Sequence, residues 1–237
     1  MTRSLLALAL LLGACSPETQ VVEDRRYQDM EPTAGGEATD PVALEHVRRG
    51  IALVQAQQCP RAMAEGFEPA LAIFAARYGD AIPRASRIQG SELPGPEVSD
   101  TLYLEAFCLV ELGETERAAA LLERALTVIP GDVVYACELG HIRQGEQRHQ
   151  DALRLFGTAV EYARALRQTP GMEGTSLFGQ SLVWWEGRAL RGIGYTQYEL
   201  GDFAAAEAAY RQALALDPND ERALQELQLI ATRRGAI

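Results

Sequence analysis

The apolar residues from position 41 to the C-terminus recur at three- and four-residue spacing, in short segments that Gly, Pro and Asp interrupt. This spacing places apolar side chains along one face of an α-helix, whereas a half-buried strand needs strict alternation. Alanine, leucine, glutamate and arginine dominate the segments, and all four favour helix. The pattern therefore predicts an all-α fold in which short helices pair as antiparallel hairpins.

An order of small, large and small residues returns along the chain, first after 34 residues. Its positions are Ala118, Leu122 and Ala125 in residues 99–132, Ala152, Phe156 and Ala159 in residues 133–166, and Ala206, Tyr210 and Ala213 in residues 187–220. Proline, which cannot continue a helix, closes the first and third copies. The chain therefore contains an internal repeat.

This period and residue order resemble the tetratricopeptide repeat. The resemblance implies an α-solenoid of helix hairpins, because one hairpin cannot bury its own apolar face and must stack on the next. Small residues such as Gly194 and Ala206 would let two helices approach closely, with Tyr210 filling the space beneath. Residues 221–237 are then expected to form a C-terminal capping helix over the last apolar face.

Two regions depart from the repeat. Residues 41–98 are expected to form a degenerate hairpin and a loop, with helices over 41–58 and 69–81 and the loop over 82–98. Cys59 would then lie near the end of the first helix. The third copy is also displaced, since 54 rather than 34 residues separate its first alanine from that of the second copy. An insertion over 167–186 accounts for the difference, and we expect it to lengthen the neighbouring helices around a loop at 170–174.

The N-terminal segment is predicted to be a leader. An apolar run follows Arg3, and it is too short to span a bilayer but long enough for a signal-peptide core. It ends at Leu12-Gly13-Ala14-Cys15, which resembles a bacterial lipobox; an ordinary secretory signal is the alternative. The resemblance implies a leader over 1–14 and a lipid on Cys15, which begins a disordered tether over 15–40. Ser16 then points to the periplasmic face of the outer membrane, with the lipid as the only membrane contact.

Charge and composition exclude several classes of reaction and of partner. The chain has 22 basic and 33 acidic residues, a formal net charge of -11, and no lysine. Schiff-base, P-loop and Ser-Lys chemistry all need a lysine amine. The acidic balance argues against nucleic acid as a partner, since phosphate neutralisation needs a basic stripe.

No motif indicates catalysis, a metal or a cofactor. The stretch GIGYTQ over 192–197 lacks the third glycine and the preceding strand of a dinucleotide-binding loop, so helix packing explains it better. His46, His141 and His149 do not have metal-ligand spacing. We therefore expect a protein that is not an enzyme and that binds no cofactor and no metal.

Three cysteines follow the lipobox, namely Cys59, Cys108 and Cys137. An exported protein meets an oxidising compartment, where one pair is expected to bond. The helices that carry Cys59 and Cys108 should run side by side, which favours this pair. The alternative is Cys108 with Cys137, although the repeat register offsets these two residues along the helix axis.

The family resemblance also implies a binding surface. In tetratricopeptide arrays the first helix of each repeat commonly lines a concave groove for peptides, and arginine there can hold a carboxylate. Counting the groove positions onto this chain gives Tyr103, Phe107, His141, Gln144, Arg188, Arg191, Tyr195 and Tyr198. Any one of them could instead pack between helices. The expected function is a membrane-anchored scaffold that binds an envelope protein or peptide. A small-ligand carrier with a cleft near Trp184, Trp185 and Tyr195 is the alternative.

Overall fold

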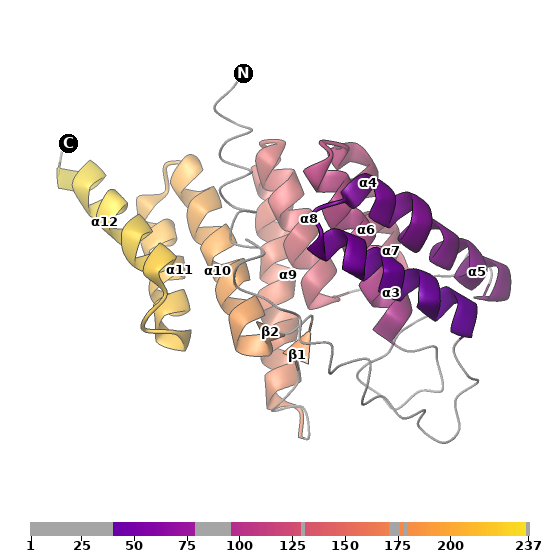
Figure 1. Cartoon of the computed structure of the whole chain (residues 1–237). Coiled ribbons are helices and arrows are strands. Elements are labelled where there is room, and N and C mark those ends of the chain that lie inside the picture. The colour runs from indigo at the N-terminus through magenta and orange to yellow at the C-terminus, as the bar shows by residue number, and fades with distance from the viewer. Residues whose placement is uncertain (1–39, 79–95, 129–130, 171–175, 178–179, 236–237) are drawn as a thin grey trace. The chain divides into compact units, whose positions relative to one another are not determined.

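The computed structural model describes residues 40–78, 96–128, 131–170, 176–177 and 180–235, and nearly all of them are helical (Figure 1). The chain divides into two compact units, Met1–Pro130 and Gly131–Ile237, which we call the N-terminal and C-terminal units. The predicted all-α fold of helix hairpins with a C-terminal capping helix is confirmed. The predicted leader, Cys15 and nearly all of the predicted tether lie outside the described residues.

In the N-terminal unit, α3 packs against the helical segment that follows it. The elements are α3 (Pro41–Gln55), α4 (Cys59–Ala62), the π-helical turn η3 (Met63–Phe67), α5 (Glu68–Tyr78), α6 (Pro96–Glu111) and α7 (Thr115–Val128). Asp40 caps α3 by accepting hydrogen bonds from the backbone amides of Val42 and Ala43. The described core of this unit is mainly apolar and includes Phe67, Phe74 and Leu109.

Two expected boundaries in this unit were wrong. The second helical segment begins at Cys59 and not at residue 69, because Gln57 adopts a left-handed backbone with φ of 57° and turns the chain early. Cys59 therefore opens a helix rather than ending one. In addition, α6 begins at Pro96 and takes up residues 96–98, which were expected in the loop. Proline suits the first turn of a helix, where its missing N–H has no partner to lose.

The crossing of α3 and η3 depends on two glycines. A Cβ atom on Gly66 would lie 2.4 Å from the Cα atom of Gly50, and a Cβ on Gly50 would lie 2.4 Å from the Phe67 ring. Both distances are far below ordinary contact, so any larger residue would push the two segments apart. Glycine is needed here for space, although it costs helix stability.

The C-terminal unit contains the following elements: α8 (Val133–Gly145), α9 (His149–Gln168), the strands β1 (Ser176–Leu177) and β2 (Gln180–Ser181), α10 (Leu182–Glu199), α11 (Phe203–Leu216) and α12 (Glu221–Gly235). Consecutive helices pack against each other, and α8 also packs against α10 (Figure 1). The capping helix α12 buries Ala223 and Ile230.

The insertion forms one structure that the sequence did not predict. The helix α9 runs to Gln168 and α10 begins at Leu182, and between them β1 and β2 pair as a short antiparallel ladder. Ser176 lies opposite Ser181 in this ladder. Two-residue strands are too short for the alternation that identifies a strand in sequence. Most of the loop expected at 170–174 lies outside the described residues.

The small and large positions of the repeat meet as predicted. A Cβ atom on Gly194 would lie 2.8 Å from the Tyr210 ring. Phe156 is shared by two helices, since a Cβ on Gly140 of α8 or on Gly192 of α10 would lie within 2.7 Å of its ring. We call α8 and α10 the inner helices and α9 and α11 the outer helices. One aromatic ring on each outer helix thus limits how closely the inner helices approach it.

Candidate functional site

The residues predicted to bind a partner lie in two different surroundings in the C-terminal unit. His141, Gln144 and Arg188 are buried, with 5%, 5% and 7% of their surface exposed. Arg191, Tyr195 and Tyr198 on α10 are half-buried. The first set is therefore bonded inside the unit, and the second set reaches solvent.

Arg188 lies at the centre of the buried set. Its Nη2 donates to Oε2 of Glu138 over 2.9 Å, and its Nε donates to Nε2 of His141 over 3.2 Å. The guanidinium also lies 5.6 and 5.5 Å from the ring centroids of Trp184 and Trp185, within cation–π range. This cluster links α8 to α10, because Glu138 and His141 come from α8 and Arg188 from α10.

The hydrogen bond from Arg188 determines the protonation state of His141. A ring nitrogen that accepts from Arg188 cannot carry a proton, so His141 is neutral here and its proton lies on Nδ1. Burial lowers the pKa of His141 well below its ordinary value, and the charge of Arg188 lowers it further. Burial also raises the pKa of the neighbouring Cys137 thiol to about 12, which leaves it protonated and unreactive.

Gln144 forms a second link between the two inner helices. Its Nε2 donates to the backbone carbonyl of Gly192 over 3.1 Å and to Oγ1 of Thr196 over 2.6 Å. The Thr196 hydroxyl in turn donates to the same carbonyl over 2.8 Å. Gln144 is thus used to hold α8 against α10.

Arg191 connects α10 to the capping helix. Its Nη1 forms an ion pair with Oδ2 of Asp220, whose other oxygen accepts from the backbone amide of Ala223 over 3.2 Å and caps α12. Both arginines that the sequence offered for a partner's carboxylate are therefore paired with acids of the chain itself.

The two remaining predicted residues of α10 are the half-buried Tyr195 and Tyr198. Tyr198 contacts the Phe203 ring edge-on at 5.4 Å between centroids, and Arg233 of α12 lies 5.9 Å from the Tyr198 ring. Burial raises the pKa of Tyr195, and the carboxylates of Glu199 and Glu226 raise it further. We call Tyr195, Tyr198, Glu199 and Glu226 the α10–α12 surface; it combines half-buried aromatic rings with acidic side chains.

In the N-terminal unit, Tyr103 and Phe107 are half-buried on α6. The neighbouring Glu105 is only 8% exposed, and its Oε2 has no hydrogen-bond partner within the described part of the chain. Burial raises the pKa of Glu105 to about 7, and the nearby charge of Glu68 adds to this effect while Arg117 opposes it. Residue spacing alone could not distinguish this carboxyl from the solvated acids around it.

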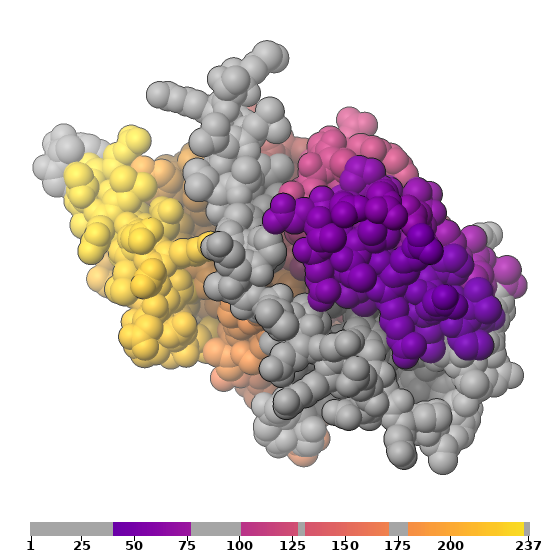
Figure 2. Space-filling view, viewed as in Figure 1, coloured from indigo at the N-terminus to yellow at the C-terminus, as the bar shows by residue number. Residues whose placement is uncertain are grey.

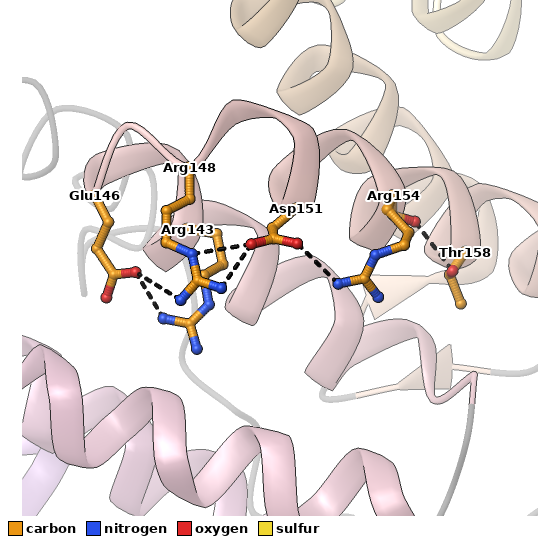
Figure 3. A network of polar contacts seen from close by, with 6 residues as sticks. All are labelled: Arg143, Glu146, Arg148, Asp151, Arg154 and Thr158. Atoms are coloured by element: carbon orange, nitrogen blue, oxygen red, sulfur yellow. Dashed lines mark hydrogen bonds and ion pairs between the residues drawn. The ribbon is translucent and has the colours of Figure 1, made fainter.

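Two ionic networks in the C-terminal unit were not predicted. At the turn between α8 and α9, Arg148 pairs with Asp151 over 2.6 Å, Arg143 pairs with Glu146 over 2.6 Å, and Arg154 extends the row (Figure 3). This network is mostly exposed, and such pairs contribute little stability.

The second network is centred on a buried carboxylate. Glu186 of α10, which is 2% exposed, accepts from Arg164 over 2.6 Å and from Arg167, both on α9. Because Glu186 lies in the insertion, the repeat pattern gave no signal for it.

Cys59 and Cys108 lie together in the N-terminal unit, with their Sγ atoms 2.6 Å apart. Cys59 opens α4 and Cys108 lies in the last turn of α6, and the two helices are in contact. Cys137 belongs to the C-terminal unit and is fully buried.

Over the described ranges, no three His, Cys, Asp or Glu side chains gather closely enough to hold a metal ion. The Nδ1 atom of His46 lies 3.1 Å from the backbone carbonyl of Glu65. Among the helices that the structure describes, none is long and apolar enough to cross a bilayer.

Comparison with known proteins agrees with this architecture. Tetratricopeptide repeat profiles match residues 187–220 and 100–128. A search of curated proteins gives no match. Among solved structures, MamA 41-end from Desulfovibrio magneticus RS-1 is similar with a TM-score of 0.58 and 17% identity, over 84% of this chain and 88% of that chain. A MamA RS-1 ArsTM double mutant gives a TM-score of 0.58 and 16% identity over the same shares.

These similarities concern two segments and the fold. Residues 187–220 and 100–128 match tetratricopeptide repeat profiles, and the fold is an all-α array of helix hairpins. The repeat matches support a protein–protein interaction scaffold, a role that such repeats commonly fill.

Proposed function

We propose that this chain is a non-catalytic scaffold, anchored by a lipid on Cys15 to the periplasmic face of the bacterial outer membrane, that binds an envelope protein or peptide. The lipobox-like tetrapeptide after a short apolar core supports the anchor. The tetratricopeptide matches support partner binding. The lack of lysine supports a role without amine chemistry.

The α10–α12 surface is the binding surface that the contacts favour. The side chains of His141, Gln144 and Arg188 form hydrogen bonds inside the C-terminal unit. Arg191 is paired with Asp220. Tyr195 and Tyr198 keep part of their rings exposed, and tyrosine gives a large contact area at low entropic cost. The observation that carries the proposal is thus the pair of half-exposed rings at inner-helix positions of the best-matched repeat.

The partner is expected to be basic. The carboxylates of Glu199 and Glu226 lie close enough to Tyr195 to raise the pKa of its hydroxyl. The charge of Arg191 is paired with Asp220, Arg233 shows that the Tyr198 ring accepts a guanidinium, and the whole chain has a formal charge of -11. A segment that contains lysine or arginine would gain charge complementarity with the acids and cation–π contact with the rings. An acidic segment would meet like charge, which disfavours its binding.

Site-specific photocrosslinking in intact cells tests this function. Benzoylphenylalanine replaces Tyr195 or Tyr198 in the tagged full-length chain, and a control carries it at Arg211 of α11, whose side chain is 71% exposed. We expect a discrete adduct from the two tyrosine positions, absent at Arg211, in which the crosslinked peptide is basic. Equal adducts at all three positions, or none at the tyrosines, would overturn binding at this surface.

A charge-matched comparison tests the chemistry of the partner. The Glu199→Gln variant should reduce the yield of the Tyr198 adduct several-fold, because it removes an acid beside the rings. A control with Glu161→Gln, an exposed acid on the outer helix α9, should leave the yield unchanged. If both variants lower the yield equally, general attraction to an acidic protein explains it, and a specific basic partner is excluded.

A further inference from the structure

Two thiols in the N-terminal unit lie closer together than two sulfur atoms in ordinary van der Waals contact. The Sγ atoms of Cys59 and Cys108 are 2.6 Å apart, whereas even carbon atoms in ordinary contact keep about 3.5–4.0 Å. Each cysteine lies on a helix, and the contact of α4 with α6 fixes both backbones. No rearrangement of the helices is therefore needed to bring the two sulfurs to bonding distance.

We propose that Cys59 and Cys108 form a disulfide that fastens α4 to α6 when the folded chain meets a disulfide oxidant. A thiolate of Cys59 attacks a sulfur of the oxidant, forms a mixed disulfide and releases one thiol. The Cys108 thiolate then attacks Sγ of Cys59 and releases the second thiol. Two electrons and two protons pass from the cysteines to the oxidant, whose disulfide is reduced to two thiols.

Exposure assigns the order of these two steps. Cys59 retains 8% of its surface exposed, while Cys108 is 0% exposed, so an oxidant can reach only Cys59 first. Burial raises the pKa of both thiols, which makes them slow nucleophiles and is typical of structural rather than catalytic cysteines. The bond is therefore expected to be a lasting link and not a turnover site.

Cys137 is a natural internal control. It is also 0% exposed, and burial raises the pKa of its thiol to about 12. No other described cysteine lies in its unit. It is expected to stay reduced under conditions that oxidise the other two.

Counting thiols in the purified full-length chain tests the bond. The folded, reduced protein is incubated with oxidised glutathione, quenched in acid, denatured and labelled with maleimide-polyethylene glycol. We expect two fewer adducts than in the reduced sample, full recovery after dithiothreitol, and a linked peptide pair that contains Cys59 and Cys108. The loss of two adducts should persist in Cys137→Ser and in Cys15→Ser.

Single variants test the order of attack. In Cys108→Ser, the accessible Cys59 should accumulate a glutathione adduct in the intact mass; in Cys59→Ser, Cys108 should stay free. Circular dichroism confirms that each variant is folded. An unchanged adduct count in the folded wild type overturns the disulfide, as does a loss of two adducts that disappears in Cys137→Ser. None of these readouts depends on a partner or on membrane location.

Discussion

Two buried carboxyl groups illustrate how surroundings decide the behaviour of a residue. Glu186 is 2% exposed and accepts from two arginines, so its charge is compensated. Glu105 is 8% exposed, and one of its oxygens has no hydrogen-bond partner in the described residues. An isolated charge is costly in an apolar interior, whereas a paired one is tolerated.

Glu105 should make the N-terminal unit less stable as pH rises. Its pKa is about 7 in the folded state against an ordinary value of 4.5, so between these values the folded state holds more protons than the unfolded state. The contribution of Glu105 to stability is then greatest below about pH 4.5. It falls as the pH rises to about 7 and stays low above that pH. The shift corresponds to a loss on the order of 3 kcal/mol.

Glu105→Gln should remove that dependence and stabilise the unit at pH 8. Urea unfolding followed by circular dichroism at pH 5 and pH 8 measures the effect. Both tryptophans, Trp184 and Trp185, lie in the C-terminal unit, so their fluorescence serves as an internal control. Identical pH dependence in wild type and variant would show that Glu105 is not the responsible group.

Loss of the charge should destabilise the fold at Glu186, whereas it should stabilise the fold at Glu105. Glu186→Gln removes the charge that holds Arg164 and Arg167, which are partly exposed, and should lower the free energy of unfolding by about 2 kcal/mol. Replacing both arginines by methionine leaves a buried carboxylate without its ion-pair partners and should cost about 3–5 kcal/mol. Tryptophan fluorescence in urea measures both changes. Equal effects would show that burial of the charge is not the controlling factor.

At the scale of elements, the inner helices are spaced by glycine and aromatic residues. Gly192 and Gly194 of α10 lie against the rings of Phe156 and Tyr210. By contrast, a Cβ on Gly157 of α9 would meet nothing within 4 Å. The same substitution therefore has opposite consequences on neighbouring helices.

Gly157→Ala should stabilise the C-terminal unit by about 1 kcal/mol, because alanine loses less conformational entropy in a helix. Gly192→Ala should destabilise it by about 1–3 kcal/mol, since the new Cβ would lie 2.6 Å from the Phe156 ring. Thermal unfolding of both variants beside wild type measures the difference. A stabilising Gly192→Ala would mean that Phe156 can shift at little cost.

The repeat helices could be predicted from sequence because their small and large residues recur at fixed spacing. The start of the second helical segment, over residues 59–78, could not be predicted, for two physical reasons. The left-handed Gln57 gives no sequence signal, since that conformation is rare for glutamine. The π-helical turn Met63–Phe67 also shifts the phase of the apolar face, which a constant helical period does not follow.

The binding residues were harder to predict than the helices. Repeat position indicated that His141, Gln144 and Arg188 face the inner side, but it could not show that Glu138, Gly192 and Thr196 already occupy their hydrogen-bonding groups. Such pairings join residues about 50 positions apart. They depend on side-chain geometry, which a periodic pattern does not contain.

At the scale of the whole molecule, the charge of -11 and the predicted anchor act together. An acidic scaffold held at a membrane would recruit basic partners from solution and concentrate them there. The proposed lipid on Cys15 and the proposed α10–α12 binding surface should therefore be separable, since the first would provide location and the second recognition.

Cys15→Ser should move the full-length chain from the membrane pellet to the soluble fraction of lysed cells. One acyl chain alone holds a protein only weakly, so loss of all lipid should shift most of the protein. Cys137→Ser is the matched control and should stay in the pellet. Retention of Cys15→Ser in the membrane fraction would exclude a lipid on Cys15 as the anchor.

The Glu138–His141–Arg188 cluster bears on how this array could evolve or be engineered. Repeat proteins are usually modular, so that a unit can be duplicated, deleted or transplanted with modest damage. Here the helices α8 and α10 share a buried ion pair, and each carries only one half of it. A graft that separated them would leave an uncompensated charge in both products. The second and third repeats should therefore be inherited as a single cassette.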